Sequence, residues 1–262
     1  MNDEIPQEST LSAPPAVAAD VPRDPGSPVQ RKAVAIAELI LCSSIPTQAS
    51  IQLFLIYVIG LQPVTEDQQF SLSFVVTMSL VDTVVLIALM VALSRAHGDS
   101  LSELWLGKAS ILKECLVGIA YIPPILLLVV IVLNTVRLFA PALHNVETNP
   151  LEQLATGGAA SVAAFGAVAI FAGGVREELQ RAFVLRRFER HLGGADVGVL
   201  VWSVAFGLGH AVQGWDAAIT TGVLGAVWAG IYLRRRSSVA PIVSHAGFNS
   251  LEVLRVAIAG SP

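Results

Sequence analysis

Three clusters of polar side chains interrupt the apolar second half of the sequence. The first contains Glu177 and Glu178, the second ends at His210, and the third contains His245 and Asn249. A carboxylate in a low-dielectric cavity near a histidine can become basic enough to deprotonate water at neutral pH. A histidine and an amide can stabilise the oxyanion of a tetrahedral intermediate. These are the residue types that the hydrolysis of a peptide bond requires.

The spacing of these residues indicates which side chains share a helix face. Glu177 and Arg181 are four residues apart, so they lie on one face. His245 and Asn249 have the same spacing. Glu178 points about 100° away from Glu177, so we expect it to support the reaction. A lone histidine or asparagine in a membrane is usually a helix-packing hydrogen bonder, but three clusters in one half of the chain favour a site.

The amino-acid composition indicates what kind of protein positions these side chains. The chain has 262 residues, of which 54% are hydrophobic and 14% charged, and its mean hydropathy is +0.67. Soluble domains usually carry about 25% charged residues, so we expect a polytopic membrane protein in contact with the lipid bilayer. No basic surface for nucleic acid is indicated. Cys42 and Cys115 lie in or beside apolar segments and predict neither a disulfide nor a cysteine metal site.

Apolar stretches predict an all-α bundle of about seven spans, with a catalytic core in the last four. The fourth stretch is too long for one crossing, so its basic end should project into the cytoplasm. Asp82 would lie near the middle of the second span, where it is either functional or tied to helix-packing serines and threonines. Trp105 should mark a short interfacial helix at the headgroups. The predicted spans are 33–61, 70–94, 116–139, 156–191, 197–212, 217–233 and 239–258.

Three regions follow from this division. Residues 1–30 are rich in proline, alanine, serine and aspartate and predict a disordered cytoplasmic tail. Residues 31–150 would form the N-terminal transmembrane helices, and residues 151–262 the catalytic transmembrane core. Pro46 could kink the first span.

The distribution of lysine and arginine predicts the orientation, because these residues favour the cytoplasmic side. With seven spans, the basic clusters near residues 31, 95, 108, 187 and 235 fall on one side. Outside the first polar cluster, only Arg137 and Arg255 fall on the other side. We therefore expect an integral protein of a bacterial plasma membrane with a cytoplasmic N-terminus.

The helical rise gives the depth of each cluster. Glu177 lies about 14 Å and His245 about 9 Å from the cytoplasmic ends of their helices, and His210 about 20 Å. These depths are compatible with one cavity in the middle of the membrane, which we expect to open toward the cytoplasm.

The clusters resemble those of the intramembrane endopeptidases related to the CAAX prenyl endopeptidase, also called the bacteriocin-processing or CPBP family. The resemblance covers about residues 156–260, and the order and spacing of the motifs make it specific. Its motifs are Glu177-Glu178-Leu179, the Phe206 to His210 spacing, the Gly222-to-Arg234 segment with Gly225 and Tyr232, and His245 to Asn249.

This resemblance implies a role for each residue. Glu177 would activate the water with the help of His210, while His245 and Asn249 would hold the oxyanion. Glu178 would support them as the second glutamate of the pair. The substrate would be a membrane-anchored peptide or protein, prenylated or not.

One position departs from the family pattern. The family usually places an arginine four residues after the second glutamate, whereas Arg181 stands three residues after Glu178, and position 182 is alanine. Either Arg181 supports the site by pairing with Glu177 one turn away, or the site is altered.

A metal is a further alternative. His210 and His245 together with a glutamate resemble a zinc set that has an open fourth position. No His-Glu-x-x-His motif is present, and the same residues suit a metal-free glutamate mechanism. We favour metal-independent catalysis over zinc.

Three functions are compatible with the sequence. The first is an intramembrane endopeptidase, which the intact clusters favour. The second is a non-catalytic immunity or scaffold protein of the same fold. The third is a proton-coupled transporter that uses Glu177, His210 and Asp82 as a relay, but no sequence repeat supports it.

Overall fold

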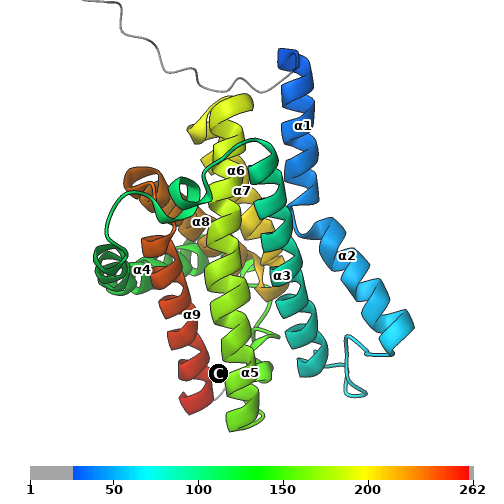
Figure 1. The fold of residues 1–262 in the computed structure, drawn as a ribbon. Helices are drawn as coiled ribbons and strands as arrows, with labels where there is room; N and C mark the ends of the chain where they lie inside the picture. Colours follow the sequence, from blue (N-terminus) through cyan, green and yellow to red (C-terminus); the bar gives the residue numbers. More distant parts are fainter. Residues whose placement is uncertain (1–25, 260–262) are drawn as a thin grey trace, which may run out of the picture.

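The computed structural model describes residues 26–259, and within this range the chain forms helices and no extended strand, with one isolated bridge between Val64 and Phe70. The predicted all-α bundle is confirmed (Figure 1). The elements in order are α1 (Pro28–Leu41), α2 (Ile45–Phe54), η1 (Leu55–Ile59), α3 (Leu72–Ala96), η2 (Ser102–Leu106), α4 (Ile111–Phe139), η3 (Pro141–Leu143), η4 (Glu152–Ala155), α5 (Ala159–Val168), η5 (Ala169–Arg176), α6 (Glu177–His191), α7 (Ala195–Gly209), η6 (Ala211–Gln213), α8 (Trp215–Arg235) and α9 (Val239–Ala259).

Five helical segments are long and apolar enough to cross a membrane. α7 is apolar but shorter, and α9, which carries two of the predicted site residues, is not among the five. The chain is thus polytopic, while the number of seven spans stays a prediction. The five segments are Pro28–Ile59, Leu72–Ala96, Ser102–Phe139, Ala159–His191 and Trp215–Arg235.

The first predicted span is divided into two helices. α1 ends at Leu41 and α2 begins at Ile45, and between them Ser44 adopts a left-handed conformation with φ 72°. At the other end of α1, a capping box of Ser27 and Gln30 starts the helix. Residues 28–30 of the predicted tail are therefore helical, and residues 1–25 lie outside the described part of the chain.

The short helix predicted around Trp105 is present as η2, whereas its position at the headgroups stays a prediction. The indole Nε1 of Trp105 donates a hydrogen bond to the carbonyl of Leu179 at 3.2 Å, and its ring packs against two buried clusters, one with Leu185 and one with Phe183. The indole therefore finds both an apolar contact and a hydrogen-bond acceptor on α6, which holds η2 against this helix.

The bundle has two chemically different ends. α1 begins at one end and α3 and α6 finish there, at the top of Figure 1, whereas α5 begins and α9 finishes at the other. We call the first the basic end, because it gathers most of the cationic side chains, and the second the loop end, because it carries residues 140–158. The cationic residues of the basic end are Arg31, Lys32, Arg95, Lys108, Lys113, Arg186, Arg187, Arg190, Arg234, Arg235 and Arg236.

A buried ion cluster at the basic end joins α1 and the segment after α3 to α6. The side chain of Arg187 is 1% exposed and donates to Glu38 at 2.6 Å and to Asp99 at 2.9 Å. Since a buried charge is strongly destabilising without its partner, these contacts fix α6 relative to the N-terminal helices.

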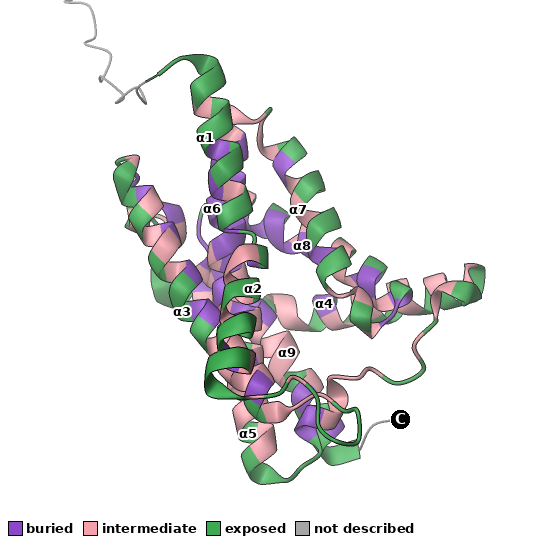
Figure 2. Ribbon diagram, turned by 90° about the vertical axis from the view of Figure 1, so that its right-hand side faces the viewer, coloured by how far each residue is buried: buried purple, intermediate pink, exposed green. Residues whose placement is uncertain are grey.

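The helices enclose a core around the site while leaving an apolar surface outside. Phe206, Leu224 and Trp228 form a buried cluster with residues of α4 and α9. Large apolar side chains on the outer faces are exposed, such as Leu138 and Ile258. Figure 2 shows these exposed faces, and also that α4 runs across the direction of α6. An apolar exterior of this kind suits contact with lipid.

Candidate active site

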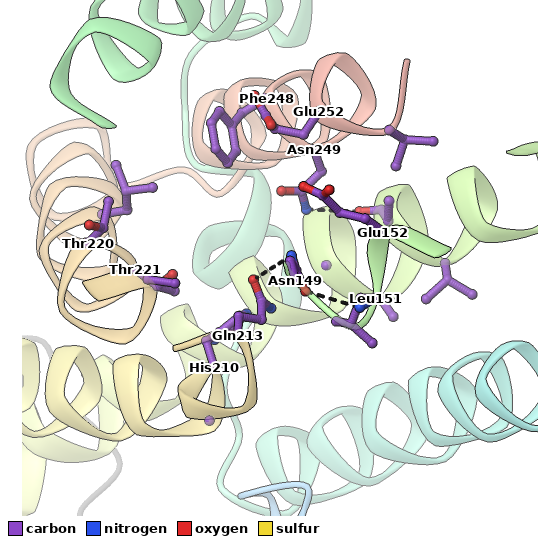
Figure 3. Close-up of a pocket in the computed structure, with 18 of the residues that line it drawn as sticks. Asn149, Leu151, Glu152, His210, Gln213, Thr220, Thr221, Phe248, Asn249 and Glu252 are labelled. Carbon is purple, nitrogen blue, oxygen red and sulfur yellow. Dashed lines mark hydrogen bonds between the residues drawn. The ribbon is translucent and has the colours of Figure 1, made fainter. Parts of the chain in front are cut away.

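The four residues predicted to be catalytic line one cavity of about 870 Å³. Glu177 comes from the start of α6, His210 from the end of α7, and His245 and Asn249 from α9. Figure 3 shows His210 and Asn249 on different walls of this cavity. Residues far apart in the sequence therefore meet around one space, as the hydrolytic interpretation requires.

The innermost contact joins the second glutamate to the first histidine of α9. Glu178 Oε1 lies 2.7 Å from His245 Nδ1, and the two residues are 1% and 4% exposed. A carboxylate can only accept, so Nδ1 carries the proton. The ring of His245 also stacks on Trp228, with centroids 3.8 Å apart. Glu178 thereby fixes the tautomer and the orientation of His245.

Arg181 completes this buried pair, and its partner differs from the one that the sequence suggested. The guanidinium Nη1 contacts Glu178 Oε2, three residues earlier, and no ion pair joins Arg181 to Glu177 among residues 26–259. The proposed pairing with Glu177 was wrong, because a side chain three residues away on the same helix is equally within reach.

The environment of Arg181 is an aromatic cage. The guanidinium carbon lies 5.5 Å from the ring centre of Trp202, 5.2 Å from that of Phe206 and 5.6 Å from that of Trp228. The residue is 0% exposed. Aromatic faces attract a guanidinium more strongly when both are desolvated. The three rings therefore stabilise the buried charge of Arg181 in addition to its ion pair with Glu178.

Glu177 lies beside this pair and faces the cavity. Its Oε1 accepts a hydrogen bond from Arg176 Nη2 at 3.0 Å, and its Oε2 lies 4.0 Å from His245 Nε2. The side chain is 14% exposed, against 1% for Glu178. Of the two carboxylates, Glu177 is thus the one that water can reach.

The support for Glu177 comes from a network that sequence reasoning missed. Arg176 donates to Ser44 Oγ at 2.6 Å and lies 3.7 Å from Asp82 Oδ2. Gln180 donates to the carbonyl of Cys42 at 2.5 Å. The only signal in the sequence was the position of Arg176 directly before Glu177, because its partners Ser44 and Asp82 lie more than 90 residues earlier in the chain.

Asp82 belongs to this support. It is 1% exposed and accepts hydrogen bonds from Thr47 and from Gln48, the latter at 3.2 Å. The sequence left open whether Asp82 is functional or is tied to helix-packing side chains. The structure shows the second arrangement, through Thr47 and Gln48, and Arg176 is a third partner.

His210 lines the cavity without touching the carboxylates. Its Nδ1 lies 2.8 Å from the carbonyl of Phe206 and therefore donates to it, which leaves Nε2 as an acceptor in the neutral ring. The ring of Phe206 makes edge contacts with both imidazoles, at 4.9 Å to His210 and 6.0 Å to His245. Among residues 26–259, no hydrogen bond joins His210 to Glu177.

Asn249 is oriented by the helix that precedes α6. Its Nδ2 donates to the carbonyl of Ala169 at 3.1 Å. Because an amide nitrogen carries two hydrogens, the second remains for a ligand. Ala169 begins η5, a π-type segment directly before Glu177, and such segments often occur at functional sites.

Two adjacent glycines allow α9 to approach this segment. A methyl group on Gly173 would lie 2.5 Å from Asn249 Nδ2, and one on Gly174 would lie 2.5 Å from the Ala246 methyl and 2.9 Å from its Cα. Small residues that let helix backbones approach closely are typical of membrane bundles.

These glycines predict a separation of activity from stability. Gly173→Ala should keep the fold, because only the end of a side chain must move, but it should displace Asn249 and lower any cleavage by roughly 10²–10³-fold, the typical cost of losing one oxyanion donor. Gly174→Ala should destabilise the protein by about 1–3 kcal/mol through overpacking. Thermal melting in detergent beside a cleavage assay measures both. Gly166→Ala in α5, where nothing lies within 4 Å of the added methyl, is the control and should change neither.

The comparison with known protein families bears on the same part of the chain. Residues 159–251 match the family model of the type II CAAX prenyl endopeptidase Rce1-like proteins. The resemblance is thereby confirmed for this segment. No curated protein and no solved structure matched the chain. The Rce1-like segment contains all six predicted site residues, from Glu177 to Asn249.

The donor atoms in the Rce1-like segment do not fit a zinc ion. Zinc in a catalytic site takes three converging protein ligands, and residues 26–259 contain no group of three or more His, Cys, Asp or Glu side chains arranged in this way. Nδ1 of His245 donates to Glu178 and Nδ1 of His210 to a carbonyl, so each ring offers only its Nε2, and no third side chain of this kind converges with them among residues 26–259.

The direction in which the cavity extends differs from the sequence-based expectation. Its walls continue from Glu177 to Arg137, Asn149 and Glu252 at the loop end, and none of the cationic residues of the basic end lines it. The cavity thus extends away from the end that the sequence assigns to the cytoplasm, so the predicted cytoplasmic opening and the predicted cytoplasmic placement of the basic end do not both hold. Helical rise gives the depth of a residue, but not the side on which the helices diverge.

Proposed function

We propose that this integral membrane protein is an endopeptidase that cuts a membrane-associated peptide with water activated by Glu177. The observation that carries the proposal is the pair of unequal carboxylates beside His245: Glu178 is buried and bonded to Nδ1, whereas Glu177 is water-accessible and 4.0 Å from Nε2. Unequal environments of neighbouring carboxyl groups are typical of acid–base sites. The match to the Rce1-like family supports the same reaction class.

The reaction would proceed in two steps. Glu177 accepts a proton from water as the water oxygen bonds to the carbonyl carbon of the substrate, and the carbonyl becomes an oxyanion. The free N–H of Asn249 donates to that oxyanion, and His245, which Glu178 holds through Nδ1, would add a second donor when its Nε2 also carries a proton. The carbon–nitrogen bond then breaks, and Glu177 returns the proton to the leaving amine.

His210 would act from the other wall of the cavity. Its Nε2 is the free acceptor of the ring, so it can receive a hydrogen bond from the attacking water or from the substrate amide. This role explains why its Nδ1 is held by the carbonyl of Phe206: the hydrogen bond sets the tautomer that leaves Nε2 unprotonated.

A cleavage assay tests the proposal. The purified protein should cut membrane-anchored peptides, and parallel prenylated and unprenylated substrates would define the anchor that it accepts. We propose a metal-free mechanism, so cleavage should survive treatment with a chelator. Asn249→Ala should lower turnover by roughly 10²–10³-fold in a protein that remains monodisperse. A protein that cuts neither substrate would favour the scaffold function, and cleavage lost on chelation and restored by zinc would contradict the metal-free mechanism.

A further inference from the structure

The walls of the cavity beyond the site come from the loop end alone. Away from Glu177, they are formed by the first half of α3, the end of α4, the start of α8 and the last turns of α9. Arg137, Glu147 and Asn149 line it there. At the opposite side of Glu177, the buried Arg181 and its aromatic cage close the space toward the basic end. The site therefore communicates with one end of the bundle.

The two ends differ sharply in cationic charge. Apart from Arg176 and Arg181 in the site, the arginines and lysines among residues 26–259 lie at the basic end, with the exception of Arg137 and Arg255. Each of these two is paired with a carboxylate at 2.7–2.8 Å: Arg137 with Asp216, and Arg255 with Glu152. Membrane proteins keep unbalanced lysine and arginine on the cytoplasmic side, so the loop end faces away from the cytoplasm.

From these two observations we infer that the substrate enters from the non-cytoplasmic face of the membrane. The inference rests on the proposed peptidase function and adds the class of substrate: a peptide segment exposed at that face, such as part of an exported or membrane-anchored protein. A chain confined to the cytoplasm cannot reach the site.

The connection between α4 and α5 crosses the mouth of this cavity. Its first part is held by the start of α8: His144 Nδ1 lies 2.8 Å from Asp216, and Asn145 accepts a hydrogen bond from the Trp215 backbone at 2.9 Å. Figure 3 shows the next contact, in which Asn149 donates to Gln213 at 3.3 Å.

The second part of the connection is held by the end of α9. Glu152 pairs with Arg255 at 2.7 Å, and the buried Ala155 packs against Val253 and Val256. The connection therefore bridges the two walls, and a peptide must pass beside it. The mouth also carries more carboxylates than guanidinium groups, because Glu147 lines it as well and Arg255 pairs with both Glu152 and Glu252; this suits a peptide without excess negative charge.

Cysteine labelling in intact cells tests the inference independently of catalysis. Thr221→Cys, inside the cavity on α8, should react with a small membrane-impermeant thiol reagent from outside, and Glu147→Cys at the mouth should react with a bulky one. Lys108→Cys at the basic end should react only after the membrane is permeabilised. The unsubstituted protein, with Cys42 buried and Cys115 half-buried, gives the background.

The second measurement is the cleavage activity of the labelled proteins. The bulky label on Glu147→Cys should lower cleavage at least several-fold, whereas the same label on Lys108→Cys should not. Labelling of Thr221→Cys from the cytoplasmic side alone would overturn the inference, as would full activity of the labelled Glu147→Cys protein. If the unsubstituted protein cuts no peptide, the proposed function fails, but the Thr221 labelling still decides which face the cavity opens to.

Discussion

Replacing Glu177 by glutamine should lower peptide cleavage by at least about 10²–10⁴-fold, the usual contribution of a general base, while the protein stays folded. Glutamine keeps the shape of the side chain and can still accept a hydrogen bond from Arg176 through its amide oxygen. It cannot take a proton from water at neutral pH. The measurement is turnover of a membrane-anchored peptide beside thermal melting in detergent.

The matched control for this prediction is Glu103→Gln. Glu103 is exposed on η2, outside the cavity of the site, so the same chemical change should leave both turnover and melting unaltered. An active Glu177→Gln protein would show that another group is the base. A protein that loses its fold together with its activity would assign Glu177 a structural role.

Replacing Arg181 by alanine should destabilise the protein by about 3–5 kcal/mol, the cost of breaking a buried ion pair. The change would leave the carboxylate of Glu178 in a fully enclosed space with His245 as its remaining partner, and would empty the aromatic cage. Thermal or denaturant unfolding in detergent measures the loss. Activity should fall as well, because Glu178 orients His245.

Two further variants serve as controls for this prediction. Arg186→Ala removes an arginine of the same helix whose side chain is 38% exposed and whose ion pairs are 3.9 Å long, so it should cost about 0–1 kcal/mol. The double variant Glu178→Gln with Arg181→Met removes both buried charges and should be more stable than Arg181→Ala alone. A stability loss in Arg181→Ala no greater than in Arg186→Ala would contradict the role of the buried pair.

The sequence predicted the helices and a set of residues that line one cavity, because helical length and spacing are local patterns. Apolar length predicted the spans, and helical spacing predicted that Glu178 would point away from Glu177 toward a supporting role. The local pattern also predicted that His245 and Asn249 would share a wall of the cavity.

The missed features depend on contacts between distant segments. Arg176 could not be matched with Ser44 or Asp82 from the sequence, because nothing in a helix pattern states which helices become neighbours. The turn at Ser44 between α1 and α2 was missed for a related reason: the Oγ of this residue, whose backbone is left-handed, accepts hydrogen bonds from Arg176 in η5 and Gln180 in α6. The opening of the cavity depends on how helices diverge, which periodicity does not encode.

The ion cluster around Arg187 has a consequence for how the chain can be divided. Arg187 lies within the Rce1-like segment, but its partners Glu38 and Asp99 precede that segment by more than 50 residues. A fragment limited to residues 159–251 would carry this guanidinium without a counter-charge in an apolar interior, together with an Arg176 deprived of Ser44 and Asp82. We therefore expect that the matched segment does not fold alone, and that an insertion, fusion or truncation that separates it from α1 to α3 would remove part of its interior.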